Sequence, residues 1–358
     1  MENNQGRYKE NKKSGGSLII PVILLVITAG LYTAARRIAG FAEWYASNVY
    51  PHLVESIGRL SGMTQYSAAE FICLLIPVLL IADIIICRHR LRKVIKHILV
   101  LVCVLALMYT ANCGVNYYRN GFVSPDTYVK AEFTEADLVD YCNYVIVKLS
   151  ESDAASADEA VYPSGKDLSE GAIAAMTKLG AEYPGLAGYY PQPKQLRYLS
   201  GFFSSMGVSG IYSPFTIEAN VNGQMEGMEM PFTSCHELSH LRGYMNEGEA
   251  NYIGWLACIG SDDPAFRRSG WLIAWSYAGS SLRRTDPDKF EEVAADLPES
   301  AAAELRANHE FWASHETKAS EIQDQVNDAY LKSNGLKDGV ASYGKLTTLM
   351  LLWYQDNH

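Results

Sequence analysis

Three long apolar runs, all in the first third of this 358-residue chain, restrict its fold more than any other feature. They extend from Leu18 to Ala35, from Ala68 to Cys87 and from Val94 to Cys113. A helix of about 20 apolar residues crosses the hydrocarbon layer of a bilayer, so each run predicts a membrane-spanning helix. The chain therefore divides into a tail (1–17), a three-span transmembrane region (18–113) and one large domain (114–358).

The basic residues around these runs indicate how the chain is oriented. They gather before the first run and between the second and third, at Arg7, Lys9, Lys12, Lys13, Arg88, Arg90, Arg92, Lys93 and Lys96. Lysine and arginine are in excess in cytoplasmic loops, so both segments, including the N-terminal tail, are expected in the cytoplasm. The large domain is then extracytoplasmic, in a multi-pass protein of the plasma membrane. A cleaved signal peptide is an alternative interpretation of the first run, and it leaves the domain on the same side.

The net charge of −10 conceals a difference between the two parts of the chain. Residues 1–113 contain twelve Lys and Arg against six Asp and Glu, which leaves 18 basic and 34 acidic residues in the large domain. Such an acidic domain argues against nucleic acid as a partner, because nucleic-acid phosphates bind basic surfaces. The membrane lipid bilayer is the partner that the apolar runs predict.

Residues 236–240 read His236-Glu237-Leu238-Ser239-His240, an H-E-x-x-H motif in the large domain. Residues four apart lie on one face of a helix, so His236 and His240 can direct two imidazoles to one zinc ion. Glu237 lies beside them and can take a proton from a water that attacks a carbonyl. The motif predicts a zinc-dependent hydrolase. A structural interpretation competes with it, because Ser234-x-x-Glu237 also fits a capping box that only begins a helix.

A zinc site of this type needs a third protein ligand, and the residues after the motif offer two carboxylates. Gly243 is suited to end the motif helix, and Asn246 is suited to cap a second helix that begins at Glu247. Glu247 and Glu249 lie about 200° apart around that helix, so only one of them faces the metal. Glu247 is the expected ligand, because its face also carries Asn251, which can hydrogen-bond a histidine. Glu249 remains the alternative; otherwise it is expected to be solvated or paired with an arginine.

The spacing after the motif resembles an element of known metallopeptidases. Glu247-x-x-Ala250-Asn251 is similar to the E-x-x-A-[DN] element of the gluzincin type, which implies Glu247 as zinc ligand and Asn251 as support of a histidine. The wider chain resembles a bacterial membrane family labelled domain of unknown function 3810 and described as zincin-like. The matching pieces are residues 116–119, 210–216, 231–233, 236–240, 247–251 and 342–344. This resemblance implies a zincin-like fold and a metal site, but no substrate.

The rest of the domain is expected to be mainly helical, an α+β arrangement with a small sheet before the zinc helix. Alternation over residues 207–222 predicts one or two strands, and residues 211–219 are the candidate edge strand. An edge offers N–H and C=O groups to an extended peptide, although an ordinary sheet edge fits equally well. Residues 150–166 are expected to form a surface loop. Helices are predicted over residues 134–149, 168–179, 264–282, 298–331 (as one helix or two) and 342–354, with another from Asp286.

Two candidate groups near the motif remain open at this stage. Cys235 and Cys258 flank the motif on adjacent helices, so one disulfide between them is an alternative to two buried thiols. A carbonyl attack also needs a group that stabilises the oxyanion. Tyr343 is the candidate for this role, while His309 and His315 are expected to be surface histidines.

These features predict a membrane-anchored zinc metallopeptidase that hydrolyses peptide or protein substrates outside the cytoplasm. His236, His240 and Glu247 are the predicted ligands of Zn²⁺, and Glu237 is the predicted general base. The alternative is a non-catalytic zincin-like membrane protein, which serves as a binding or scaffold module with structural zinc or none.

Overall fold

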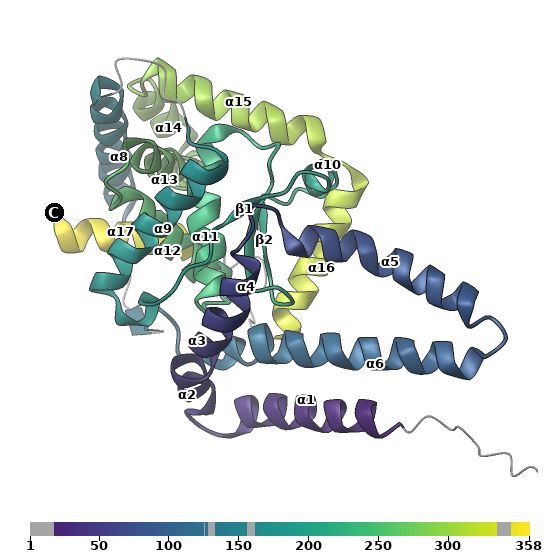
Figure 1. Ribbon diagram of the computed structural model, residues 1–358. Helices are drawn as coiled ribbons and strands as arrows, with labels where there is room; N and C mark the ends of the chain where they lie inside the picture. Colours follow the sequence, from purple (N-terminus) through teal and green to yellow (C-terminus); the bar gives the residue numbers. More distant parts are fainter. Residues whose placement is uncertain (1–17, 125, 128–132, 156–161, 335–344) are drawn as a thin grey trace, which may run out of the picture.

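The computed structural model describes residues 18–124, 126–127, 133–155, 162–334 and 345–358. Within these residues the chain is mainly helical and contains one small three-stranded sheet. Figure 1 shows a helical domain from which three long helices extend toward the same side. The expected combination of apolar N-terminal helices, a mainly helical domain and a small sheet is confirmed at this level.

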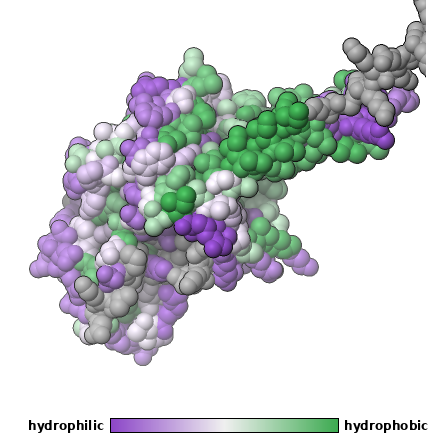
Figure 2. Space-filling model, turned by 90° about the horizontal axis from the view of Figure 1, so that it is seen from below, coloured by the Kyte–Doolittle hydropathy of each residue, from purple (hydrophilic) through white to green (hydrophobic). Residues whose placement is uncertain are grey.

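The three projecting helices are long and apolar enough to cross a membrane. They are α1 (Ile19–Arg37), α5 (Ala68–Ile86) and α6 (Leu91–Tyr109), and α6 continues through a π-helical turn (Thr110–Gly114) and a 3-10 turn (Asn116–Tyr118). Many of their apolar side chains are exposed, and Figure 2 shows them as a hydrophobic arm beside the more polar domain. Such surfaces are unfavourable in water and suit lipid.

The segment between α1 and α5 packs on the domain. It forms α2 (Phe41–Asn48), α3 (Tyr50–Leu53), a π-helical turn (Val54–Gly58) and α4 (Arg59–Ser61). Tyr50 is 1% exposed, and its hydroxyl lies 2.8 Å from the hydroxyl of Tyr212 and 2.9 Å from the carbonyl oxygen of Leu241. Residues that precede the second span are thus part of the same hydrophobic core as the helix that carries the H-E-x-x-H motif.

The sheet has the strand order β1-β3-β2. Its strands are β1 (Lys194–Gln195), β2 (Gly210–Ser213) and β3 (Glu218–Val221). β1 runs parallel to β3, whereas β2 runs antiparallel to it, with Tyr212 opposite Ala219. The prediction of strands over residues 207–222 is confirmed. The candidate edge strand over residues 211–219 is corrected, because a turn divides it: its first part belongs to the edge strand β2 and its last part to the central strand β3.

Two buried carboxylates attach α5 to the domain. Glu218 on β3 accepts hydrogen bonds from the backbone N–H groups of the first two residues of α5, at 3.1 and 2.8 Å. It also accepts one at 2.5 Å from the buried ammonium of Lys194 on β1. Glu70, in the first turn of α5, accepts hydrogen bonds from the backbone of residues 197–199. Because carboxylates at a helix N-terminus satisfy its unpaired N–H groups, these contacts fix the domain-side end of α5.

Two helices carry the H-E-x-x-H motif and the residues that follow it. α11 (Met230–Leu241) packs against the sheet and against α12 (Glu247–Ile259). The capping-box interpretation of Ser234 is wrong, since α11 begins four residues earlier, with Pro231 in its first turn. The hydroxyl of Ser234 instead donates to the carbonyl oxygen of Met230 at 2.8 Å inside the helix. The motif therefore occupies the second half of α11 and does not begin it.

The remaining helices complete the domain. They are α8 (Glu135–Ala155), α9 (Gly165–Glu182), α10 (Ser200–Ser205), α13 (Pro264–Thr285), α14 (Pro287–Ala294), α15 (Glu299–His315), α16 (Lys318–Ser333) and α17 (Lys345–Asn357), with 3-10 turns at Pro184–Leu186 and Gly227–Glu229. Among them, α9, α13 and α17 pack against α11 or α12. Residues 298–331 form two helices, because Thr317 caps α16 in a capping box with Ser320. The loop predicted from residue 150 is corrected, since α8 continues to Ala155 and α9 already begins at Gly165.

Candidate metal centre

The turn between α11 and α12 brings the motif histidines close to the start of the second helix. Gly243 has a φ of 90°, a conformation that favours glycine, and it ends α11 as predicted. Asn246 caps α12 by accepting a hydrogen bond from the N–H of Glu249 at 3.3 Å. A Cβ added to Gly254 would lie 3.1 Å from the backbone nitrogen of His236, so glycine lets the two helices approach closely.

His236, His240 and Glu247 form one cluster at this contact. Their ligand atoms all lie within 4.8 Å of one another. One carboxylate oxygen of Glu247, Oε2, is 3.4 Å from Nε2 of His236 and 3.6 Å from Nε2 of His240. Tetrahedral zinc with bonds of about 2.0–2.1 Å separates its ligand atoms by about 3.4 Å, so these spacings fit such an ion. Two imidazoles and one carboxylate are also a ligand set that hydrolytic zinc sites use.

Hydrogen bonding and charge hold these side chains in place. Nδ1 of His240 donates to the carbonyl oxygen of Tyr244 at 2.8 Å, which leaves Nε2 directed at Glu247. Burial opposes the charged form of His240, but the nearby Glu247 carboxylate raises its pKa to about 9. Burial also opposes ionisation of Glu247, yet the two imidazoles hold its pKa well below the usual value. The cluster is therefore held together by opposite charges.

The expected support of a histidine by Asn251 is not seen. Nδ2 of Asn251 and Nδ1 of His236 are both buried, and neither has a hydrogen-bond partner among the described residues. The group that does orient a ligand histidine is the backbone carbonyl of Tyr244. A carbonyl is present at every residue, so no side-chain pattern in the sequence could have identified it.

Glu237 lies at the free edge of the sheet. The N–H of Asn222 donates to the carbonyl oxygen of Ser209 at 2.7 Å, which makes these residues a hydrogen-bonded pair. Hydrogen-bonded and non-hydrogen-bonded pairs alternate along an antiparallel ladder. The backbone N–H and C=O groups of Gly210 and Tyr212 therefore point away from β3. The Tyr212 N–H accordingly interacts with the Glu237 carboxylate.

This position desolvates the carboxylate of Glu237. The residue is 4% exposed, and its Oε2 has no hydrogen-bond partner among the described residues. Burial raises the pKa of Glu237 to about 7, against the opposing influence of the two motif histidines. A Cβ added to Gly210 would lie 2.6 Å from Oε1 of Glu237, so the strand needs a glycine there. The sequence analysis assigned no role to this glycine.

Glu249 lies apart from the cluster. It is buried, and its carboxylate accepts hydrogen bonds from the backbone N–H groups of Phe122 and Val123 in the segment after α6. Burial raises the pKa of Glu249 despite these contacts. The expectation that Glu249 is solvated or paired with an arginine is therefore corrected, because it binds backbone amides. Among the described residues, Glu247 is the carboxylate that groups with the two histidines.

The other predicted site residues are not part of this cluster. Tyr343 lies outside the described residues, so its predicted role stays a prediction. His309 and His315 lie on α15, where Nδ1 of His315 is 2.8 Å from the carbonyl oxygen of Phe311. Cys235 and Cys258 are buried free thiols, so the alternative of a disulfide between them is not realised.

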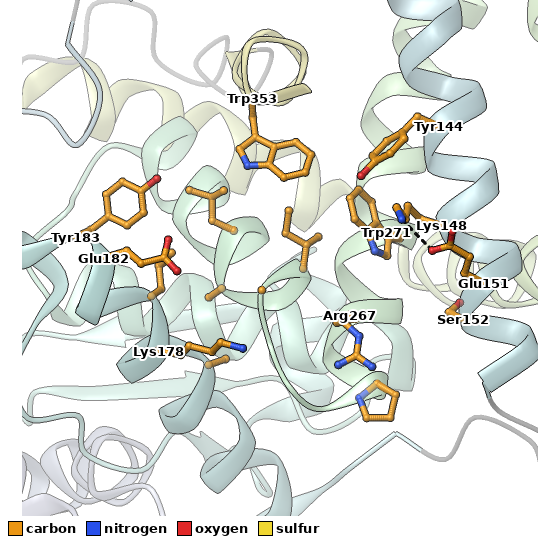
Figure 3. A pocket seen from close by; sticks show the side chains of 17 residues that line it. Tyr144, Lys148, Glu151, Ser152, Lys178, Glu182, Tyr183, Arg267, Trp271 and Trp353 are labelled. Atoms are coloured by element: carbon orange, nitrogen blue, oxygen red, sulfur yellow. Dashed lines mark hydrogen bonds and ion pairs between the residues drawn. The ribbon is translucent and has the colours of Figure 1, made fainter. Parts of the chain in front are cut away.

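A separate pocket lies on another side of α12. Figure 3 shows its lining, in which Trp271 and Trp353 lie among polar side chains from several helices. Its volume is about 560 Å³, and none of the clustered histidines and glutamates lines it. Its basic groups already have partners, since Lys148 pairs with Glu151 and Lys178 pairs with Asp262. The pocket is therefore distinct from the candidate metal centre.

Comparison with known proteins identifies a family but no characterised relative. No curated protein and no solved structure matches the sequence. A family model described as "Protein of unknown function (DUF3810)" matches residues 45–351, which include the second and third candidate spans, the sheet and the whole candidate metal centre. The match covers most of the chain, and the protein therefore belongs to the DUF3810 family.

Proposed function

We propose that this protein is a membrane-anchored zinc hydrolase that cleaves peptide bonds. The observation that carries the proposal is the cluster of His236, His240 and Glu247 beside the buried carboxylate of Glu237, at the edge of a sheet. A site that only holds a structural zinc is normally closed by four protein ligands. Here the described residues supply three, and a second carboxylate, that of Glu237, lies adjacent with an unpaired oxygen.

His236, His240 and Glu247 are the residues that hold the zinc ion in this proposal. When bound, zinc supplies Lewis-acid polarisation of a carbonyl and activation of water. The three side chains contribute a net charge of −1 when both imidazoles are neutral. That ligand set leaves the bound ion with a positive charge, as Lewis-acid chemistry requires.

Glu237 is the general base in this proposal. A base works best when its pKa lies near the operating pH, and burial raises the pKa of Glu237 to about 7. Its free Oε2 accepts the proton of the attacking water, and the protonated carboxyl then returns that proton to the departing amine. The Tyr212 N–H keeps the carboxylate oriented during both transfers.

The edge of β2 is the surface on which an extended substrate binds. The N–H and C=O of Gly210 and the C=O of Tyr212 point away from β3, and an added strand pairs with groups of this kind. The Tyr212 N–H is already bound to Glu237. The side chain of Ile211 is 45% exposed on this strand and is available to a substrate side chain. Peptides in extended conformation are therefore the favoured substrates.

The proposed orientation places this site outside the cytoplasm. The turn between α5 and α6, at the ends of these helices remote from the domain, lies within the basic stretch Arg88–Lys96. Cytoplasmic loops carry such basic stretches, so the domain belongs on the opposite face of the membrane.

The test uses the purified full-length chain in detergent, with metal content measured by mass spectrometry and hydrolysis by a quenched-fluorescent peptide library. We expect about one zinc per chain, lost in His240→Ala. Glu237→Gln should retain the zinc and lower hydrolysis by roughly 10²–10⁴-fold, because only the base is removed. Zinc without measurable hydrolysis would favour the non-catalytic binding module. A wild-type chain that takes up no zinc would rule out the zinc hydrolase and leave a binding module without metal.

A further inference from the structure

Helix α16 exposes an apolar face. Ile322 is 58% exposed and Val326, one turn later, is 56% exposed. Tyr330, another turn on, is 37% exposed, whereas Leu331 on the opposite face is completely buried. Lys318, one turn before Ile322, lies at the start of the exposed face, as in helices at membrane surfaces, where lysine stems follow the apolar layer and ammonium groups remain in water.

Both ends of α16 are attached close to the domain-side ends of membrane helices. At its N-terminus, the hydroxyl of Thr317 donates to the carbonyl oxygen of Ser205, the last residue of α10, at 2.8 Å. The segment before α10 is the one that Glu70 of α5 binds. At its C-terminus, the hydroxyl of Tyr330 accepts hydrogen bonds from the hydroxyls of Tyr109 and Tyr117, at 3.0 and 3.1 Å. α16 thus connects the end of α5 with the end of α6.

This connection determines the direction of α16. α5 and α6 meet at a tight turn remote from the domain and diverge toward it (Figure 1). In the same view α16 crosses the direction of both helices, level with their domain-side ends. If α5 and α6 cross the bilayer, α16 therefore lies along its surface.

Aromatic side chains mark the same level on the other helices. Tyr198, before α10, lies 5.9 Å from Phe71 in α5, measured between ring centroids. On α1, Tyr32 lies 6.1 Å from Tyr118, and Arg36 stacks over the Tyr32 ring. Tyrosine and tryptophan are enriched where a bilayer meets water. α16 thus lies within an aromatic layer of the type found at membrane interfaces.

The candidate metal centre is close to this layer. Sγ of Cys113, at the end of the third candidate span, is 3.6 Å from Sδ of Met245, two residues before Glu247. The amide of Asn112 donates to the carbonyl oxygen of Pro214 at 2.6 Å, directly after the edge strand β2. The span therefore contacts both the turn that leads to Glu247 and the end of the proposed substrate strand.

We propose that the Ile322–Val326 face of α16 is inserted into the lipid of the domain-side leaflet, between the diverging ends of α5 and α6, and that the metal centre acts on polypeptides bound at that surface. The lipid contact follows from the attachment of α16 to the spans and from its exposed apolar face. The substrate class rests in addition on the proposed hydrolase function.

The lipid contact is tested with the full-length protein in nanodiscs of phosphatidylcholine that contain a small fraction of a diazirine-bearing phosphatidylcholine. After illumination and tryptic digestion, we expect lipid adducts on peptide 319–332 from α16 and none on peptide 290–306, which covers parts of α14 and α15. The double variant Ile322→Asp/Val326→Asp should lose the adducts, whereas Gln325→Asp, an exposed position on the same helix, should keep them. If peptides from the spans carry lipid adducts and peptide 319–332 carries none, the proposed lipid contact of α16 is overturned.

The substrate class is tested with one reporter peptide in two forms, one carrying an acyl anchor in phosphatidylcholine vesicles and one soluble. We expect faster cleavage of the anchored form by the wild type, and a ratio of the two rates closer to one in the double variant. Equal rates for both forms in the wild type would overturn the substrate class. Lipid adducts without any hydrolysis would support the membrane contact and contradict the proposed hydrolase, so the two failures are distinguishable.

Discussion

Glu247 and Glu249 lie two residues apart at the start of α12 but have different contacts. Their substitutions are therefore predicted to have different effects. Glu247→Ala should remove zinc from the full-length protein, because its Oε2 lies beside both histidine nitrogens. Glu249→Ala should retain zinc and cost about 1–3 kcal/mol of stability, because the N–H groups of Phe122 and Val123 lose their acceptor. Metal content and thermal unfolding of both variants check this. Zinc retained in Glu247→Ala and lost in Glu249→Ala would reverse the assignment.

The half-buried carboxyl of Glu229 makes a pH-dependent contribution to the stability of the domain. Burial raises its pKa, although Asn308 and Trp312 donate hydrogen bonds at 3.0 and 2.8 Å that favour the ionised form. The pKa of Glu229 is thus higher in the folded chain than in the unfolded chain. Its contribution to the free energy of unfolding is therefore complete below the unfolded pKa and is lost as the pH rises through the folded pKa.

The matching prediction compares wild type with Glu229→Gln, whose side chain does not titrate. The free energy of unfolding of the wild type minus that of the variant should fall as the pH rises across the acidic range. Denaturant unfolding at a series of pH values measures this difference. A difference that stays constant with pH would show that Glu229 has the same pKa in the folded and unfolded chains.

Among the elements, the buried pair of Lys194 and Glu218 joins β1, β3 and the first turn of α5. Lys194→Met leaves Glu218 buried without its cation, so we expect a loss of about 3–5 kcal/mol in the free energy of unfolding. Lys166→Met is the matched control, because Lys166 pairs with Glu170 on the surface, where such pairs contribute at most about 1 kcal/mol. Equal effects of the two substitutions on chemical unfolding would contradict this role of the buried pair.

Element boundaries were predictable where a local signal acts alone. Gly243 and Asn246 mark the end of α11 and the start of α12, because left-handed φ and N-capping depend on these side chains. The competing interpretation puts a helix start at Ser234, whereas α11 begins at Met230, where Pro231 supplies an equally local signal. The division of residues 298–331 at Thr317 stayed open, because helical spacing continues across the break.

For the whole molecule, residues 114–358 are not expected to fold alone. Tyr50 and Val54, which precede the second span, are buried in the core that also contains Leu241 and Tyr212. A fragment of residues 114–358 exposes that apolar surface and loses the Tyr50 hydrogen bonds. We expect no cooperative thermal transition for the fragment, measured by circular dichroism, but a cooperative one for the full-length chain. A cooperative fragment would show that the segment before the second span is dispensable.

The sequence alone predicts the features that depend on neighbouring residues. It identified three apolar helices from their length, the pairing of His236 and His240 from helical spacing, and the start of α12 at Glu247 from its cap. The fold, in contrast, establishes that Glu247 groups with the histidines while Glu249 binds the backbone of Phe122 and Val123. It also establishes that the Tyr244 carbonyl orients His240 and that α16 bridges two spans. These contacts depend on which distant backbone atoms the fold brings within hydrogen-bond distance, and no local pattern encodes that.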